Sequence, residues 1–228
     1  MVPKVKFWLV GSTLDALQKI SSLMDHVPAA FSVTPAAGDL DGMIAFEAEN
    51  VPDPVSGLKK PLPQGFVYHP IRLAISDESF DIDYVEQSGP FCSSITRELF
   101  DLPAGTVQYF PVDTSGSSAP VREKDFKLIR VLAYRSAIDL DRSELWRVSF
   151  DERGLPAPER IIAVKSVVFK EDFESDVPLF HDPHDQRLFA TDEFAERVLE
   201  AGIKGISFID VTDRASPPGH VRTKELAH

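Results

Sequence analysis

The sequence predicts an α+β fold: a mixed, mostly antiparallel sheet with a few short helices, including two units in which a helix leads into a strand. Three observations indicate this fold. Short apolar runs with strand-like alternation recur along the chain of 228 residues. Turns rich in Gly and Pro separate these runs. A capped amphipathic helix near residue 195 is followed at once by an apolar strand.

The first ninety residues are expected to form mainly strands. In one of them Phe80, Ile82 and Tyr84 alternate with acidic residues, so one face is apolar and the other polar. Apolar residues at helical spacing indicate one short helix, and a group of prolines indicates an extended loop. The predicted elements are strands at residues 4–10, 43–48, 71–75 and 80–85, a helix at 14–24 and a loop at 51–65.

The middle of the chain is predicted to hold one helix and four strands. The helix begins after Ser93 or Ser94, either of which can cap it. Its expected buried face consists of Ile95, Leu99 and Phe100. The strands are expected at residues 107–112, 127–134, 145–150 and 160–170, with a turn at 151–154. Trp8 and Trp146 both lie within apolar strand patterns, so both indoles are expected in the core.

A second helix precedes the last predicted strand. Thr191 is expected to cap this helix, because acidic residues and then an apolar face follow it. The residues of that face are Phe194, Val198 and Ala201. Gly202 is expected to end the helix. Aligning the two helix–strand units places Tyr109 on Phe208, which indicates either a weak internal repeat or a coincidence common in α+β proteins.

Four stretches resemble those of a family of bacterial immunity proteins from polymorphic and contact-dependent toxin systems, immunity family eleven, formerly a domain of unknown function. The most specific is LFHDPHDQRLFATDEFAERVLEAGIKGISF at residues 179–208. The others are the helix–strand unit at 93–112, YFPV at 109–112 followed by KLIRVLAY at 127–134, and IDLDRSE at 138–144. The resemblance covers roughly residues 90–211. It implies a protein that binds a cognate toxin domain and neutralises it.

The chain is predicted to have three parts. Residues 1–89 form a strand-rich amino-terminal region, 90–214 form the α+β domain that resembles the immunity family, and 215–228 form a polar tail. The boundary near residue 89 rests on a plausible seam in the sequence rather than on a clear linker. A single compact unit formed by the first two parts is the alternative.

The charge of the protein suits a basic partner. The formal net charge is −12 and the sequence pI is about 4.9, which argues against nucleic-acid binding and is compatible with a basic toxin. Residues 170–196 contain nine acidic residues and only two basic ones, Lys170 and Arg187. The predicted toxin-binding residues are Glu171, Asp172, Glu174, Asp176, Asp182 and Asp185. The alternative interpretation is a solvated acidic face with no partner.

The residues that could carry chemistry form no convincing catalytic or metal-binding motif. His181 and His184 could share a metal, but Pro183 between them favours a turn. Cys92 could be a nucleophile, although a buried thiol is the commoner role of a single cysteine. Asp81 and Asp83 lie on one strand face and could act as paired acids, although the wet face of a half-buried strand is the commoner role of such residues. We therefore predict no catalytic residue, no metal and no cofactor; a small hydrolase or nucleotide-modifying enzyme and an interaction module without a toxin are the alternatives.

The sequence predicts a cytoplasmic protein. The single cysteine excludes an internal disulfide, and no apolar stretch approaches the roughly 20 residues that span a bilayer. The expected partner is a cognate toxin domain, with no nucleic acid and no membrane. The oligomeric state and the identity of the toxin do not follow from the sequence.

Overall fold

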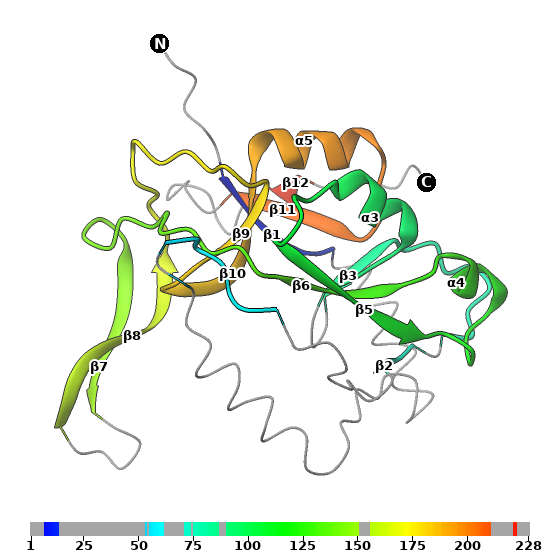
Figure 1. The fold of residues 1–228 in the computed structure, drawn as a ribbon, viewed down its shortest axis with the longest axis horizontal. Helices are drawn as coiled ribbons and strands as arrows, with labels where there is room; N and C mark the ends of the chain where they lie inside the picture. The colour runs from blue at the N-terminus through cyan, green and yellow to red at the C-terminus, as the bar shows by residue number, and fades with distance from the viewer. Residues whose placement is uncertain are drawn as a thin grey trace.

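The computed structural model describes residues 7–13, 53, 55–61, 71–73, 75–86, 90–150, 156–210 and 221–222. These residues form two five-stranded sheets, a two-stranded hairpin and three helices (Figure 1). The predicted α+β class is confirmed. The predicted helix at 14–24 and the predicted strand at 43–48 lie outside the described residues.

The first sheet is antiparallel throughout, in the order β12-β11-β1-β10-β9. Its strands are β1 (Phe7–Ser12), β9 (Leu179–Asp182), β10 (Asp185–Thr191), β11 (Ile206–Asp210) and β12 (Val221–Arg222). The amino-terminal strand β1 lies in the middle, where Leu9 pairs with Phe189 on one side and with Ile209 on the other. Trp8 is buried, as the sequence predicts.

The second sheet is mixed, in the order β2-β5-β6-β4-β3. Its strands are β2 (Ile71–Arg72), β3 (Tyr84–Glu86), β4 (Pro90–Cys92), β5 (Val107–Asp113) and β6 (Lys127–Val131). The pair β2–β5 is parallel and the other pairs are antiparallel. Phe80, Ile82 and Tyr84 are all buried, although only the last of them lies in a strand. Phe80 and Ile82 belong to one apolar cluster and Tyr84 to another, so the three side chains are buried as predicted but do not share one face, and the strand begins later than predicted.

Pairings across the predicted boundary at residue 89 bring the two parts of the chain together. Strand β1 inserts between β10 and β11, and β3 pairs with β4. If residues 1–89 and 90–214 form a single compact unit, the alternative given above, then strands from the two parts must pair in this way. The division of the chain at residue 89 stays a prediction.

The helices are α3 (Ser94–Phe100), α4 (Ala119–Glu123) and α5 (Asp192–Glu200). The hydroxyl of Ser93 accepts a hydrogen bond from the amide of Thr96, and the hydroxyl of Thr191 accepts one from Phe194, so both predicted caps are confirmed. Helices α3 and α5 lie side by side above the sheets (Figure 1), where the rings of Phe100 and Phe194 are 4.9 Å apart. Each helix leads into a strand, α3 into β5 and α5 into β11.

The prediction for the buried face of α3 is wrong at one residue. Ile95 is 57% exposed, whereas Thr96 and Phe100 are buried. The buried face therefore lies one residue further along the helix than the apolar pattern indicates. The Thr96 hydroxyl lies 3.0 Å from that of Ser93 and 3.3 Å from the carbonyl oxygen of Asp83, to which it donates. These contacts satisfy the polar group inside the protein.

Two apolar clusters pack against opposite faces of the second sheet. The larger lies between the sheets and the helices and includes Tyr84 and Cys92. The smaller lies beyond the second sheet and includes Val85 and Phe91. Tyr84 pairs with Cys92, and Val85 with Phe91, so the strand alternation sends each pair to a different cluster. The second sheet is therefore covered on both faces.

Strands β7 (Glu144–Phe150) and β8 (Pro156–Ser166) form a hairpin, which confirms the predicted pair of adjacent strands. They pair with each other and with no other strand in the part of the chain that the structure describes. In Figure 1 the hairpin projects at the lower left, away from both sheets. The prediction that Trp146 lies in the core is wrong, because this side chain is 55% exposed.

Candidate functional site

Residues 170–178, in the segment between β8 and β9, carry four of the six predicted toxin-binding acids; we call them the acidic loop. Aromatic side chains fix it to the protein: Phe173 and the preceding Phe169 pack on Phe7, with ring centroids 5.2 and 4.9 Å away. Val177 is buried in the larger cluster. The acidic side chains between these anchors are exposed. The loop thus presents carboxylates from a backbone that is held at both ends.

Basic residues from a distant part of the sequence bind two of these carboxylates. Nε of Arg135 donates to Oδ1 of Asp176 at 2.6 Å, and its Nη2 donates to Oδ2 at 2.9 Å. These bonds hold the pKa of Asp176 below its usual range. Nη1 of Arg142 donates to Oε1 of Glu171 at 2.8 Å. Part of the negative charge that the local sequence indicates is therefore balanced by residues 135–142.

The other two acids of the loop face solvent. Asp172 and Glu174 are exposed, and neither makes an ion pair with a residue that the structure describes. A charged side chain of this kind keeps its hydration and remains available to a partner. These two residues are the best candidates for long-range attraction of a basic protein.

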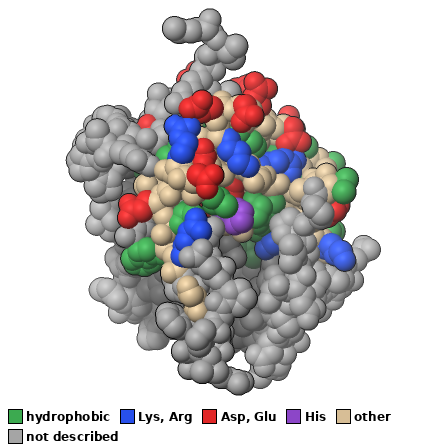
Figure 2. Space-filling view, turned by 90° about the vertical axis from the view of Figure 1, so that its left-hand side faces the viewer, with side chains coloured by type: hydrophobic (Ala, Val, Ile, Leu, Met, Phe, Trp, Pro, Cys, Tyr) green, Lys and Arg blue, Asp and Glu red, His purple; other side chains and the backbone are tan. Residues whose placement is uncertain are grey.

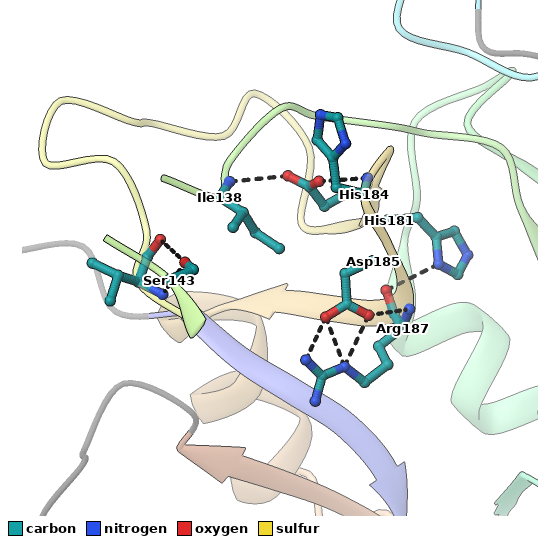
Figure 3. Close-up of polar contacts among 8 residues, drawn as sticks. Ile138, Ser143, His181, His184, Asp185 and Arg187 are labelled. Atoms are coloured by element: carbon teal, nitrogen blue, oxygen red, sulfur yellow. Dashed lines mark hydrogen bonds and ion pairs between the residues drawn. The ribbon is translucent and has the colours of Figure 1, made fainter. Parts of the chain in front are cut away.

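Asp182 lies at the end of β9 and is 0% exposed. Its Oδ2 accepts hydrogen bonds from the backbone amides of Ala137 and Ile138, at 2.8 and 2.9 Å. Its Oδ1 accepts one from the amide of His184 at 2.8 Å (Figure 3). One carboxylate thus holds the β9–β10 turn against the segment that follows β6, and none of it reaches the surface.

Asp185 opens β10 and is only 7% exposed. Nε of Arg187 lies 2.9 and 2.8 Å from its two oxygens, and Nη2 of the same guanidinium also donates to it (Figure 3). This pair closes the β9–β10 turn from within the protein. Asp182 and Asp185 therefore do not share the exposed surface of the four acids in the loop.

The two histidines of the turn are held apart. Nδ1 of His181 donates to the carbonyl oxygen of Arg187 at 3.1 Å, and its ring lies 5.2 Å from that of Tyr134. His184 is exposed, and its ring points away from His181 in Figure 3. The turn that Pro183 predicts between β9 and β10 is confirmed. Within the described ranges, no three His, Cys, Asp or Glu side chains are grouped so that they could hold a metal ion.

Cys92 lies in the core rather than in a reactive setting. Burial raises the pKa of its thiol to about 12, because the thiolate would lose its hydration there. Asp83 and Asp81, the two carboxylates that could act as paired acids, are each bound by a lysine. Nζ of Lys124 lies 2.6 Å from Asp83, and Nζ of Lys204 donates to Asp81. Each group takes part in packing or ion pairing inside this fold.

Comparison with models of known families gives a match to the Immunity protein family (Imm11) over residues 94–213. The match spans more than half of the chain. The chain belongs to the Imm11 family. The resemblance that the four sequence stretches predict is thereby confirmed. A search of curated proteins found no match.

The Imm11 region runs from α3 to the end of β11 and contains the acidic loop, the β9–β10 turn and the β7–β8 hairpin. Strands β1 and β3, which precede it, complete the two sheets. No helix among the described residues is long and apolar enough to cross a membrane. Membership of an immunity family suggests that a surface, rather than a catalytic centre, performs the work of this protein.

Sequence reasoning missed the exposed face of the β7–β8 hairpin. Leu145 packs partly against the larger core cluster, and the next residue, Trp146, points outward as strand alternation requires. A break in the strand register between Trp146 and Arg147 leaves Arg147 exposed too. The charged residues Glu144 and Arg147 on either side of the apolar pair were the signal that this strand has a wet face.

Proposed function

We propose that this protein binds a cognate toxin domain and neutralises it, acting in the cytoplasm as the immunity protein of a polymorphic toxin system. The observation that carries the proposal is the match of residues 94–213 to the Imm11 immunity family. Binding would cover the active site of the toxin or block a movement that the toxin needs. The role requires a preorganised surface and no reaction, so the proposal includes no cofactor and no catalytic residue.

A basic toxin is the partner that the charges support. The net charge of −12 repels nucleic acid and attracts a positively charged protein. The exposed acids of the loop, Glu171, Asp172, Glu174 and Asp176, add a local negative field on a fixed backbone. Charges of this kind act mainly on the rate of association and on the choice of partner.

Co-expression with the variable carboxy-terminal domain of a toxin encoded beside this protein tests the proposal. We expect a stable complex with a stoichiometry near one to one on gel filtration, and growth of cells that the toxin domain alone arrests. Growth arrest that persists with this protein present, together with separate elution of the two chains, would contradict a neutralising role.

The acidic loop should govern the rate of association. The double change Asp172→Lys and Glu174→Lys should slow binding to a basic toxin about tenfold at low ionic strength, with a smaller effect on dissociation. Neither side chain has an ion pair to lose within the described structure, so the fold should tolerate the change within about 0.5 kcal/mol for each residue. Stopped-flow or surface-based kinetics across a range of salt concentrations gives both rates.

A matched control changes the net charge equally at another place. Glu98 on α3 and Glu123 on α4 are exposed, and both helices lie to the right in Figure 1, away from the acidic loop at the upper left. The double change Glu98→Lys and Glu123→Lys should leave the association rate closer to that of the wild type. Equal slowing by both pairs would mean that only the overall charge matters, and unchanged association in both would remove the acidic loop from the proposal.

A further inference from the structure

The β7–β8 hairpin is set apart from both five-stranded sheets. It projects from the body of the molecule in Figure 1, and its two strands pair only with each other among the described strands. Its register shifts at three places along β7. Such irregularities twist a hairpin and re-aim its side chains, and they also discourage edge-to-edge aggregation.

Among the described side chains of this hairpin, Trp146 is a large apolar one with 55% of its surface exposed. Exposing an indole is unfavourable for an isolated protein, since its burial removes a large apolar area from water. Trp is also the residue type most enriched among those that dominate the energy of protein interfaces. An exposed Trp on a projecting hairpin therefore indicates a contact with another protein.

The base of the hairpin is joined to the acidic loop and to the residues just before it. The hydroxyl of Ser143 accepts a hydrogen bond from the amide of Val168 at 2.9 Å, shown in Figure 3. Ile138 forms an antiparallel bridge with Phe169. Arg142, two residues before β7, forms the ion pair with Glu171 described above. The hairpin and the acidic loop thus belong to one continuous side of the molecule.

Among the described side chains, acids outnumber bases on this side. Figure 2 views the molecule from this side and shows Asp and Glu side chains gathered over the upper part of the surface, with Lys and Arg among them. The exposed acids of the hairpin base and the acidic loop are Asp141, Glu144, Glu171, Asp172, Glu174 and Asp176. The exposed bases are Arg142, Arg147 and Lys170. A partner that covers this side is complementary in charge if its own surface is basic.

We propose that the cognate toxin domain docks on this side, with Trp146 of the β7–β8 hairpin inserted into it and the acidic loop facing its basic surface. The inference rests on the proposed function and adds the location of the interface. Trp146 supplies apolar contact that slows dissociation, whereas the acids speed the encounter. The exposed part of the indole is available for burial against the toxin domain.

Binding of the purified toxin domain to Trp146→Ala tests the inference. We expect the Kd to rise about thirtyfold or more, mainly through faster dissociation. Ile95→Ala is the matched control, because Ile95 is an apolar side chain of nearly equal exposure, 57%, on α3. That variant should bind like the wild type. Trp146→Phe should recover a large part of the affinity, since an aromatic ring is kept.

Hydrogen–deuterium exchange of the wild-type complex provides a readout without any substitution. Amides of β7 and β8 should exchange more slowly in the complex than in the isolated protein, and those of α3 should not change. A wild type that binds while Trp146→Ala binds equally well, or while exchange in the hairpin is unaltered, would overturn the location of the interface and leave the neutralising role intact. A wild type that does not bind the toxin at all would overturn the neutralising role, and the interface with it.

Discussion

Replacing Gly205 with alanine is expected to lower the free energy of unfolding by about 3–5 kcal/mol. Gly205 has a φ of +93°, which an L-residue with a Cβ rarely adopts. A Cβ there would lie 2.2 Å from the carbonyl oxygen of Tyr84 and 2.5 Å from Cγ2 of Ile82. The first of these atoms belongs to the backbone, so the strand itself would have to move.

The backbone around Gly205 holds the two sheets together. The carbonyl oxygen of Lys204 accepts hydrogen bonds from the amides of Asp83 and Tyr84, at 2.9 and 3.0 Å. The amide of Thr13 donates to the carbonyl oxygen of Gly205 itself at 2.9 Å. A shift that relieves the clash in Gly205→Ala would therefore weaken bonds to both β1 and β3. We expect the hydrogen bonds on the two sides of Gly205, which join the two sheets, to weaken together.

Gly105→Ala separates the steric effect from backbone strain. Gly105 also has a positive φ, +83°, but no heavy atom lies within 4 Å of a Cβ built there. That variant should lose only about 1–2 kcal/mol, the strain of the conformation alone. Equilibrium urea denaturation followed by circular dichroism measures both free energies. Equal losses in the two variants would show that the close approach to Tyr84 does not matter.

Replacing Asp182 with alanine is expected to lower the free energy of unfolding by about 2–4 kcal/mol. The carboxylate is fully buried and accepts three backbone N–H bonds. Removing it leaves the buried amide of Ile138 without this acceptor, whereas the amide of Ala137 keeps a second one, the carbonyl oxygen of Arg135 at 2.9 Å. A buried donor that loses its acceptor costs more than the net strength of the bond.

Two control variants identify the cause of the stability that is lost in Asp182→Ala. Asp182→Asn keeps the shape but replaces one accepting oxygen by an NH₂ group that faces backbone donors, so it should fall between the wild type and Asp182→Ala. Asp172→Ala removes an exposed acid from the acidic loop and should change stability by no more than about 0.5 kcal/mol. Denaturation of all three by urea decides the order. If Asp182→Ala were as stable as Asp172→Ala, the carboxylate would not hold the turn.

Gly205 and Asp182 stabilise the part of the fold that supports the proposed interface. Asp182 ties the β9–β10 turn to residues 137–138, and that segment leads within a few residues to the base of the hairpin. A binding surface is more effective when it is fixed before the partner arrives, since less conformational freedom is lost in the complex. Loss of toxin binding in Asp182→Ala should therefore accompany a large loss of stability, whereas Trp146→Ala should affect binding more than stability.

Local signals in the sequence were enough for much of the fold and for the family. A hydroxyl before an apolar helical pattern identified the caps at Ser93 and Thr191, and alternation identified the buried side chains of Phe80 and Ile82. These features depend on residues within a few positions of one another. The Imm11 family was recognisable because its stretches occur in order along the chain.

The tertiary structure decided which of the candidate residues reach the surface. Asp182 and Glu171 look alike in the sequence, yet one is buried against amides 44 and 45 positions away and the other is exposed beside Arg142. Trp146 fits a buried strand pattern, but its strand forms a hairpin outside both sheets; the flanking charges indicate a wet face without showing that Trp146 lies on it. The physical reason is common to these cases. Burial and charge balance are set by what packs against a residue, and in this chain that partner is remote in the sequence.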